Sequence, residues 1–234
     1  MATAAIGIMC KAPKVGRTKS RLAASIGADA AAGLSACFLR DVAAAIDAVP
    51  ETIGRCGYAV YSPAGTESEL TRLFPSSFGL LLQADENFGN VLFGAVCDLL
   101  AAKHDCVLLV NGDGPTLPTS FLVQAIDTLR QTGDRLVLGP ASDGGYYLVG
   151  LKHPHQKLFA NIEWGTASVA ESTLKRAAEI GLEVTLLPEW YDIDDLETLG
   201  WLRDELAGKS ARFRDGNPAM ATRAFLAAML ESSR

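Results

Sequence analysis

The sequence predicts an α/β fold, and three observations support that class. Apolar runs of strand length alternate with longer segments of helical periodicity throughout the 234 residues. The run within 105–111 is continuously apolar, as in a central parallel strand that is covered on both faces. Two later apolar runs, at 135–138 and 146–151, are joined by a glycine-rich bend, which indicates a mixed sheet.

In the first half of the chain, strands are expected at 4–9, 57–62 and 79–83, with a short helix at 66–74. A long helix is expected at 28–49, because large apolar residues recur there at every fourth position: Leu34, Phe38, Val42 and Ile46. Another helix is expected to begin near Asn87, since asparagine often accepts hydrogen bonds from the first amides of a helix.

The second half continues after the central strand with a helix that Thr119 is expected to cap. Ser168 and Asp194 each precede a glutamate by three residues, and this capping-box pattern predicts the starts of two further helices. Gly181 is a suitable residue to follow the end of the first of them. A strand is expected at 183–187 and a terminal helix at about 218–230.

Composition limits the class of protein. Apolar residues make up 49% of the chain and the mean hydropathy is +0.17, which excludes a disordered protein. The length favours a single domain over residues 1–234, with a C-terminal helical extension from about residue 208. The five cysteines have neither disulfide nor metal spacing, so we expect reduced thiols. No leader and no membrane span is recognisable, and we expect a cytoplasmic protein.

Residues 10–22, here called the basic loop, concentrate positive charge. They contain Lys11, Lys14, Arg17, Lys19 and Arg21, and no acidic residue precedes them. The whole chain nevertheless carries a net charge of −6. A nucleic-acid-binding protein would spread basic charge over a face, whereas a basic loop between a strand and a helix is suited to hold phosphates. The alternative is a solvated loop, although such loops usually mix charge signs.

Carboxylates follow later strands, at the edge where open α/β sheets bind their ligands. Asp113 comes directly after the central strand, between two glycines. Asp143 stands in the glycine-rich bend. Asp192 and Asp194 follow the last expected strand. Asp194 is either the cap of the next helix or a residue of the cleft, and the two roles are compatible if Asp192 or Asp194 also faces the cleft.

The other candidate residues have two interpretations each. Gly144 and Gly145 form either a simple bend or a place where substrate approaches the backbone. Trp164 is either a lid on the core or a surface for stacking. His153 and His155 lack the further ligands that a metal site needs. The chain contains neither a P-loop nor a dinucleotide-binding fingerprint, and it lacks the nucleophile elbow of serine hydrolases.

Four of these blocks, in this order, resemble one protein family. The stretch KAPKVGRTKSRL at 11–22 is similar to the basic signature of the DUF2064 family, a bacterial group within the GT-A superfamily of nucleotide-diphospho-sugar transferases and nucleotidyltransferases. GDGPTLP at 112–118 and LGPASDGGYYLVG at 138–150 are similar to its next two blocks, and DID at 192–194 is similar to the fourth. The resemblance runs from about residue 4 to residue 200.

This resemblance implies a three-layer α/β/α sandwich with a mostly parallel, mixed sheet, the GT-A fold. It implies a nucleotide substrate and a divalent cation, Mg²⁺ or Mn²⁺. Asp113 would be the first metal ligand and Asp194 the second, with Asp192 in reserve. The phosphates would be held by Lys11, Arg17, Lys19 and Arg21. The chain departs from the family at Asn90 and Val91, where relatives carry a basic residue, and at Gly114, where Ser or Asp is common.

Three hypotheses about function follow. The first is nucleotidyl transfer from a nucleoside triphosphate to a small phosphorylated or hydroxyl acceptor, with Lys19, Asp113 and Asp143 as catalytic residues. The second is glycosyl transfer from a nucleotide-diphospho-sugar, with Asp143 as the base or as a contact to the sugar, and with Gly144, Gly145 and Trp164 near the substrate. The third is a non-catalytic nucleotide-binding protein. The expected partner is a small molecule, a nucleotide or a nucleotide sugar, and not nucleic acid. No membrane span is expected, and a homodimer is kept as an alternative to a monomer.

Overall fold

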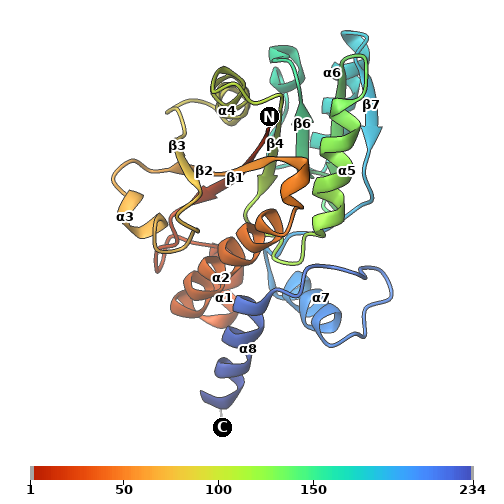
Figure 1. The fold of residues 1–234 in the computed structure, drawn as a ribbon. Coiled ribbons are helices and arrows are strands. Elements are labelled where there is room, and N and C mark those ends of the chain that lie inside the picture. The colour runs from red at the N-terminus through yellow and green to blue at the C-terminus, as the bar shows by residue number, and fades with distance from the viewer. Residues whose placement is uncertain (1–2, 233–234) are drawn as a thin grey trace.

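The computed structural model describes residues 3–232 and contains a seven-stranded sheet with helices on both faces (Figure 1). Its strand order is β3-β2-β1-β4-β6-β5-β7. The strands are β1 (Ala4–Lys11), β2 (Arg55–Ser62), β3 (Gly79–Leu82), β4 (Cys106–Asn111), β5 (Arg135–Pro140), β6 (Tyr146–Leu151) and β7 (Glu183–Leu186). Strand β6 pairs antiparallel with both of its neighbours, while every other pair in the sheet is parallel. The predicted α/β fold with a mostly parallel, mixed sheet is therefore confirmed.

The helices form two layers, one on each face of the sheet. Helices α2 (Ala28–Asp47) and α5 (Thr119–Arg130) contribute to one buried cluster, and α4 (Phe88–Ala101) and α6 (Val169–Glu179) contribute to the other. The remaining helices are α1 (Ser20–Ile26), α3 (Glu67–Leu70), α7 (Leu196–Leu206) and α8 (Met220–Ser232), with short 3₁₀ turns at Glu51–Ile53 and Gln156–Phe159. This arrangement is the three-layer α/β/α sandwich.

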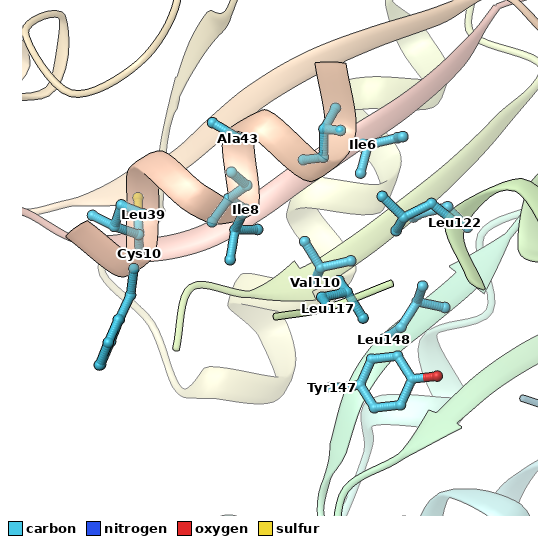
Figure 2. Close-up of a cluster of buried hydrophobic side chains, with 14 of the residues drawn as sticks. Ile6, Ile8, Cys10, Leu39, Ala43, Val110, Leu117, Leu122, Tyr147 and Leu148 are labelled. Carbon is cyan, nitrogen blue, oxygen red and sulfur yellow. The ribbon is translucent and has the colours of Figure 1, made fainter. Parts of the chain in front are cut away.

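The larger core lies between β1, β4 and helix α2. Side chains of a strand alternate between its faces, so Ile6, Ile8 and Cys10 all point to the side on which Leu39 and Ala43 of α2 lie (Figure 2). The helical stripe predicted from Leu34 to Ile46 is fully buried. The cysteines are free thiols, as expected, and burial raises the pKa of the Cys10 thiol to about 12, with a smaller contribution from the charge of Asp113.

Some of the predicted helix caps are wrong, although their helices begin at or within one residue of the expected positions. Asn87 does cap α4, since its side chain accepts a hydrogen bond from the Asn90 amide. Thr119 is instead the first residue of α5, and its hydroxyl donates to the carbonyl of Ala45 at 2.9 Å. Ser168 makes no capping bond, because its hydroxyl pairs with Thr166. The helix expected at 66–74 is shorter and covers only Glu67–Leu70.

The last helix packs against α2 and lies at the far end of the molecule from β6 and β7 (Figure 1). Asp41 of α2, which is 3% exposed, accepts hydrogen bonds from the amides of Ala221 and Thr222 and from the Thr222 hydroxyl. A buried carboxylate from another helix thus caps the first turn of α8. Within residues 3–232, none of the helices combines the length and apolarity needed to cross a membrane.

Candidate active site

The sheet brings the basic loop and Asp113 to one edge. Strands β1 and β4 are parallel neighbours, and Met9 lies opposite Asn111 in their register. Their carboxyl ends therefore emerge side by side, so that the basic loop follows one strand and Asp113 follows the other. Residues more than 90 positions apart in the chain meet at this edge.

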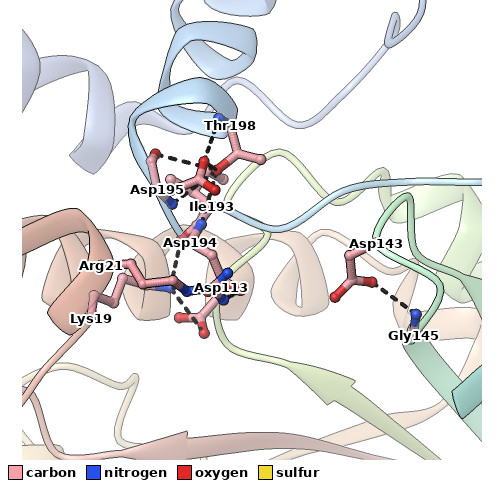
Figure 3. A network of polar contacts seen from close by, with 9 residues as sticks. All are labelled: Lys19, Arg21, Asp113, Asp143, Gly145, Ile193, Asp194, Asp195 and Thr198. Carbon is pink, nitrogen blue, oxygen red and sulfur yellow. Dashed lines mark hydrogen bonds and ion pairs between the residues drawn. The ribbon is translucent and has the colours of Figure 1, made fainter. Parts of the chain in front are cut away.

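Lys19 is the centre of the polar network (Figure 3). Its ammonium lies 3.1 Å from Asp113 Oδ2 and 3.3 Å from Asp194 Oδ1, and it donates to the carbonyl of Ile193 at 2.5 Å. The side chain is only 6% exposed. The residue precedes helix α1 in a left-handed conformation, with φ of 47°, which a lysine seldom adopts. The fold therefore holds this lysine in an unusual conformation beside two carboxylates.

The ammonium of Lys19 stays charged in this environment. Burial by itself lowers the pKa of a lysine. Here the charges of Asp113 and Asp194, and the hydrogen bonds to both, outweigh burial and raise the pKa of Lys19 above its usual value. Lys19 is therefore a fixed cation of the site.

Asp194 faces this network and does not cap the next helix, so the expectation of a cap at Asp194 is wrong. Its second oxygen, Oδ2, accepts from the guanidinium of Arg21 at 2.6 Å. The capping box of α7 is formed by Asp195, whose carboxylate accepts from the Thr198 amide, while Thr198 accepts from the Asp195 amide. The shift of the cap by one residue leaves both oxygens of Asp194 for Lys19 and Arg21.

Asp113 is held by its backbone between two crowded glycines. Its carbonyl accepts from the Ile193 amide at 3.0 Å, which fixes the β4 loop to the segment before α7. A Cβ at Gly112 would lie 2.6 Å from Leu39, and one at Gly114 would lie 3.1 Å from the carbonyl of Tyr191. The departure from the family at Gly114 therefore fits the close approach of these two segments.

Asp192 and Asp143 add negative charge near the pair. The pKa of Asp192 is raised to about 7, first by burial and then by the charges of Asp194, Asp143 and Asp113, which outweigh the opposing effect of Lys19. Asp143 is exposed, and one of its oxygens accepts from the Gly145 amide at 2.8 Å. The four predicted carboxylates thus lie close enough to interact, although they come from three separate loops.

The glycine-rich bend is tight for a steric reason. Gly144 has a φ of +89°, and a Cβ there would lie 2.0 Å from the carbonyl oxygen of Ala167. The Gly144 carbonyl accepts from the Ala170 amide in the first turn of α6. The bend consequently fixes Asp143 relative to α6.

A cavity of about 720 Å³ lies beside Lys19, on the side of the basic loop. Lys11, Lys14 and Arg17 line it together with Lys19 and Asp113. The side chain of Lys14 is 42% exposed, and its ammonium lies 4.0 Å from the carboxylate of Glu69. Four cations around one cavity favour an anionic ligand.

A second cavity of about 410 Å³ lies beyond the carboxylates. Asp143, Asp194 and Arg21 line it, as do Gly145 and Trp164. The ring of Trp164 meets those of Phe88 and Tyr146 edge to face, with centroids 5.0 and 6.3 Å away. Trp164 is half-buried, so it both covers the core and faces the cavity, and the two interpretations of this residue do not exclude each other.

Three residues that line both cavities were missed from the sequence: Met9, Phe88 and Asn111. Asn111 ends β4, and Met9 lies opposite it near the carboxyl end of β1; this position at the ligand-binding edge is the signal that could have found them. Nothing in the local sequence distinguishes Phe88, because its place depends on how α4 packs against the loop that contains Trp164.

The donor set around Lys19 fits a hard divalent cation by its chemistry. Two carboxylates and one carbonyl supply oxygen atoms, which are the ligands that Mg²⁺ and Mn²⁺ prefer. Within residues 3–232, however, no group of three or more Asp, Glu, His or Cys side chains is arranged to hold a metal. The oxygen atoms converge on the Lys19 ammonium instead.

The fold, together with the residues at the carboxyl ends of β1 and β4, indicates the class of fold to which the protein belongs. Three layers around a mostly parallel sheet, with a basic loop after β1 and a carboxylate after β4, match the GT-A-like fold of nucleotide-diphospho-sugar transferases. The chain belongs to the family described as "Uncharacterized protein conserved in bacteria (DUF2064)", whose sequence profile matches residues 46–166. The match includes Asp113 and Asp143, whereas the basic loop and Asp194 lie outside it.

A similar solved structure supports this assignment over the full length. A protein of Desulfovibrio desulfuricans G20, provisionally named a nucleotide-diphospho-sugar transferase, superposes with a TM-score of 0.82 at 25% identity, covering 99% of this chain and 98% of that one. A curated relative, N-acetylmuramic acid 6-phosphate etherase of Streptomyces coelicolor, is 34% identical over 155 residues, which are 64% of this chain. The match spans 46%, about half, of that relative's length.

More distant solved structures share the fold alone. CMP:2-keto-3-deoxy-manno-octonic acid synthetase complexed with CTP superposes with a TM-score of 0.58 at 11% identity, covering 89% of this chain and all of that one. Glucosyl-3-phosphoglycerate synthase of Mycobacterium tuberculosis, in complex with Mn²⁺, UDP and glucosyl-3-phosphoglycerate, gives 0.52 at 10% identity, covering 89% and 78%. The fold therefore occurs both in a synthetase that binds CTP and in a synthase that binds UDP together with Mn²⁺.

Proposed function

We propose that this protein is a metal-dependent transferase acting on a nucleotide, and that it moves a nucleotidyl group from a nucleoside triphosphate to a small phosphorylated or hydroxyl acceptor. One observation carries the proposal: Lys19 contacts both Asp113 and Asp194 at the rim of a cavity lined by further basic side chains. This combination of cations and carboxylates is suited to polyphosphates. Several cations in one cavity match a triphosphate better than they match a sugar.

In the proposed reaction an acceptor oxygen attacks the α-phosphorus, and the bond from this phosphorus to the bridging oxygen breaks in line, so that pyrophosphate leaves. Lys19, Arg17 and Lys11 would donate to phosphate oxygens and stabilise the charge on the leaving group. Asp113 and Asp194 would hold Mg²⁺ or Mn²⁺, with Asp192 in reserve, and such an ion supplies further charge neutralisation when bound.

Asp143 is the proposed acceptor of the proton. It lines the second cavity, and within residues 3–232 a single hydrogen bond, from Gly145, reaches its carboxylate. A hydroxyl acceptor in this cavity would pass its proton to Asp143 as the new bond to phosphorus forms. A phosphorylated acceptor needs no such base, since its attacking oxygen is already ionised.

Glycosyl transfer from a nucleotide-diphospho-sugar is the second candidate, and the second cavity favours it. Trp164, Tyr146 and Phe88 offer ring surfaces there, and Asp143 and Gly145 offer polar atoms at the same wall. Sugars present both apolar faces and hydroxyl groups, so a wall of this kind suits them. In this reading the basic loop holds the diphosphate, and Asp143 is the base or a contact to the sugar.

A thermal-shift screen of nucleoside triphosphates and nucleotide sugars with Mn²⁺ distinguishes these functions. A rise in melting temperature with triphosphates alone supports nucleotidyl transfer, and a rise with nucleotide sugars supports glycosyl transfer. Asp113→Ala is expected to abolish the metal-dependent rise while the apoprotein still unfolds cooperatively. Equal shifts for wild type and variant would exclude Asp113 as a ligand. No shift with any nucleotide would contradict the proposal altogether.

A further inference from the structure

Three oxygen atoms from two loops contact the ammonium of Lys19. Its three N–H groups meet three acceptors: Asp113 Oδ2 at 3.1 Å, Asp194 Oδ1 at 3.3 Å and the Ile193 carbonyl at 2.5 Å (Figure 3). These are the oxygens that would otherwise face a divalent cation between the two aspartates. The ammonium of Lys19 therefore takes the position that a bound metal ion would occupy.

Both carboxylates of the pair already face a cation. Asp113 and Asp194 supply two negative charges, while Lys19 and Arg21 supply two positive ones within 3.3 Å. A dication among the same oxygens would lie against the Lys19 ammonium, and the two positive charges would repel each other strongly at a position where the lysine is 6% exposed. The ammonium therefore has to move away from these oxygens before the dication can enter.

The neighbouring cavity offers the Lys19 ammonium a second position. The same side chain lines the 720 Å³ cavity with Lys11 and Arg17, so phosphates bound there would present new acceptors to its ammonium.

We propose that Lys19 determines the specificity of the Asp113–Asp194 pair, so that the pair binds a divalent cation only together with a phosphate-bearing ligand. The phosphates draw the lysine ammonium toward the basic loop and supply the charge that the metal then neutralises. Metal without nucleotide is rejected, because Lys19 competes for the same oxygens. This inference rests on the proposed function, and it adds the order in which metal and nucleotide enter.

The test measures binding of Mn²⁺ alone, by the loss of the free-ion signal in electron paramagnetic resonance, with no nucleotide present. Lys19→Met removes the competing charge and keeps the length of the side chain. It is expected to bind one Mn²⁺ about tenfold more tightly than wild type, or tighter still. Lys19→Gln is a second variant in case the first does not fold, and thermal unfolding checks both.

Two controls make the result specific. Lys175→Met makes the same change in an exposed lysine of α6 that lines neither cavity, and its Mn²⁺ affinity is expected to equal that of wild type. The double variant Lys19→Met, Asp113→Asn is expected to lose the gain, because it removes a ligand. Equal Mn²⁺ affinities for wild type and both Lys19 variants, or a gain that persists without Asp113, would overturn the inference.

The outcome is separable from that of the nucleotide screen. If nucleotides bind but the Lys19 variants gain no affinity for Mn²⁺, the competition is wrong and the proposed function stands. If the variants gain Mn²⁺ while no nucleotide binds, the competition is real and the proposed function is wrong.

Discussion

The partly buried carboxylate of Asp192 destabilises the folded protein when it is ionised, and a single substitution can measure this effect. Its pKa lies near 3.8 in an unfolded chain and is raised to about 7 in the folded protein, mainly by burial. The folded state therefore binds a proton more readily between these two values, and stability is lost as the pH rises through about 7. Asp192→Asn stays neutral and should raise the free energy of unfolding at pH 8 by about 2–4 kcal/mol. At pH 4 the gain should be small.

Urea unfolding at several pH values measures this difference. Glu197→Gln, which removes an exposed carboxylate nearby in the chain, serves as the control and should show no such pH dependence. A constant difference between wild type and Asp192→Asn from pH 4 to pH 8 would contradict the prediction. A stability gain at a carboxylate of the cleft also indicates a residue that the fold itself does not need.

At this scale the sequence predicted which residues meet, but not how. The uniform charge of the basic loop and the position of Asp113 after a strand were sufficient to place both at one cleft. The direct contact of Lys19 with Asp113 and Asp194 was not predictable, because it depends on the left-handed backbone at Lys19 and on the loop before α7. The residues shared by both cavities depend in the same way on packing.

At the level of single elements, the start of α7 allows the roles of two neighbouring aspartates, Asp194 and Asp195, to be tested separately. Asp195→Ala removes the side chain that accepts from the Thr198 amide and should destabilise the protein by about 1 kcal/mol. Asp194→Ala leaves this cap intact and removes the contacts to Lys19 and Arg21.

Hydrogen exchange of the Thr198 amide distinguishes the two variants. Its exchange should accelerate in Asp195→Ala and remain near the wild-type rate in Asp194→Ala. The reverse pattern would mean that Asp194 caps the helix after all.

Elements were predicted more securely than their ends. The buried stripe of α2 and the apolar run of β4 follow from periodicity, which many residues determine together. A helix start is determined by one or two side chains, and these have competing partners. Thr119 bonds to Ala45 of a distant segment, and Ser168 bonds to its neighbour Thr166. Among the acidic residues after β7, only the observed backbone shows that Asp195 is the cap.

At the scale of the whole molecule, the buried carboxylate of Asp41 connects helix α8 to helix α2. Asp41 bonds to Ala221 and Thr222, about 180 residues away along the chain. Asp41→Ala should leave these amides unsatisfied, destabilise the docking of α8 by about 2 kcal/mol and make the segment after about residue 208 more sensitive to proteolysis.

Limited trypsin digestion with mass spectrometry measures this change. Asp29→Ala, which removes an exposed acid in the first turn of α2, is the matched control and should be digested like wild type. Identical digestion of the Asp41 variant would mean that apolar contacts alone hold α8. Retention of the sheet after α8 is released would support our proposal of one domain with a helical extension.

The overall class was predictable, since alternating strands and helices with a continuous apolar run leave few alternatives. The reversed direction of β6 was indicated by the glycine-rich bend, because so short a connection cannot join parallel neighbours. The position of β6 between β4 and β5 was not indicated, because strand order depends on contacts between distant segments.

The ion pair between Lys19 and Asp194 spans 175 positions of the chain, which has a consequence for biosynthesis. A ribosome that adds about 5–20 residues per second takes on the order of ten to thirty seconds to reach the second partner after the first. During that interval the nascent chain presents its cationic segment without the late carboxylate. Any function that needs Asp194 beside Lys19 therefore has to wait until translation has passed residue 194.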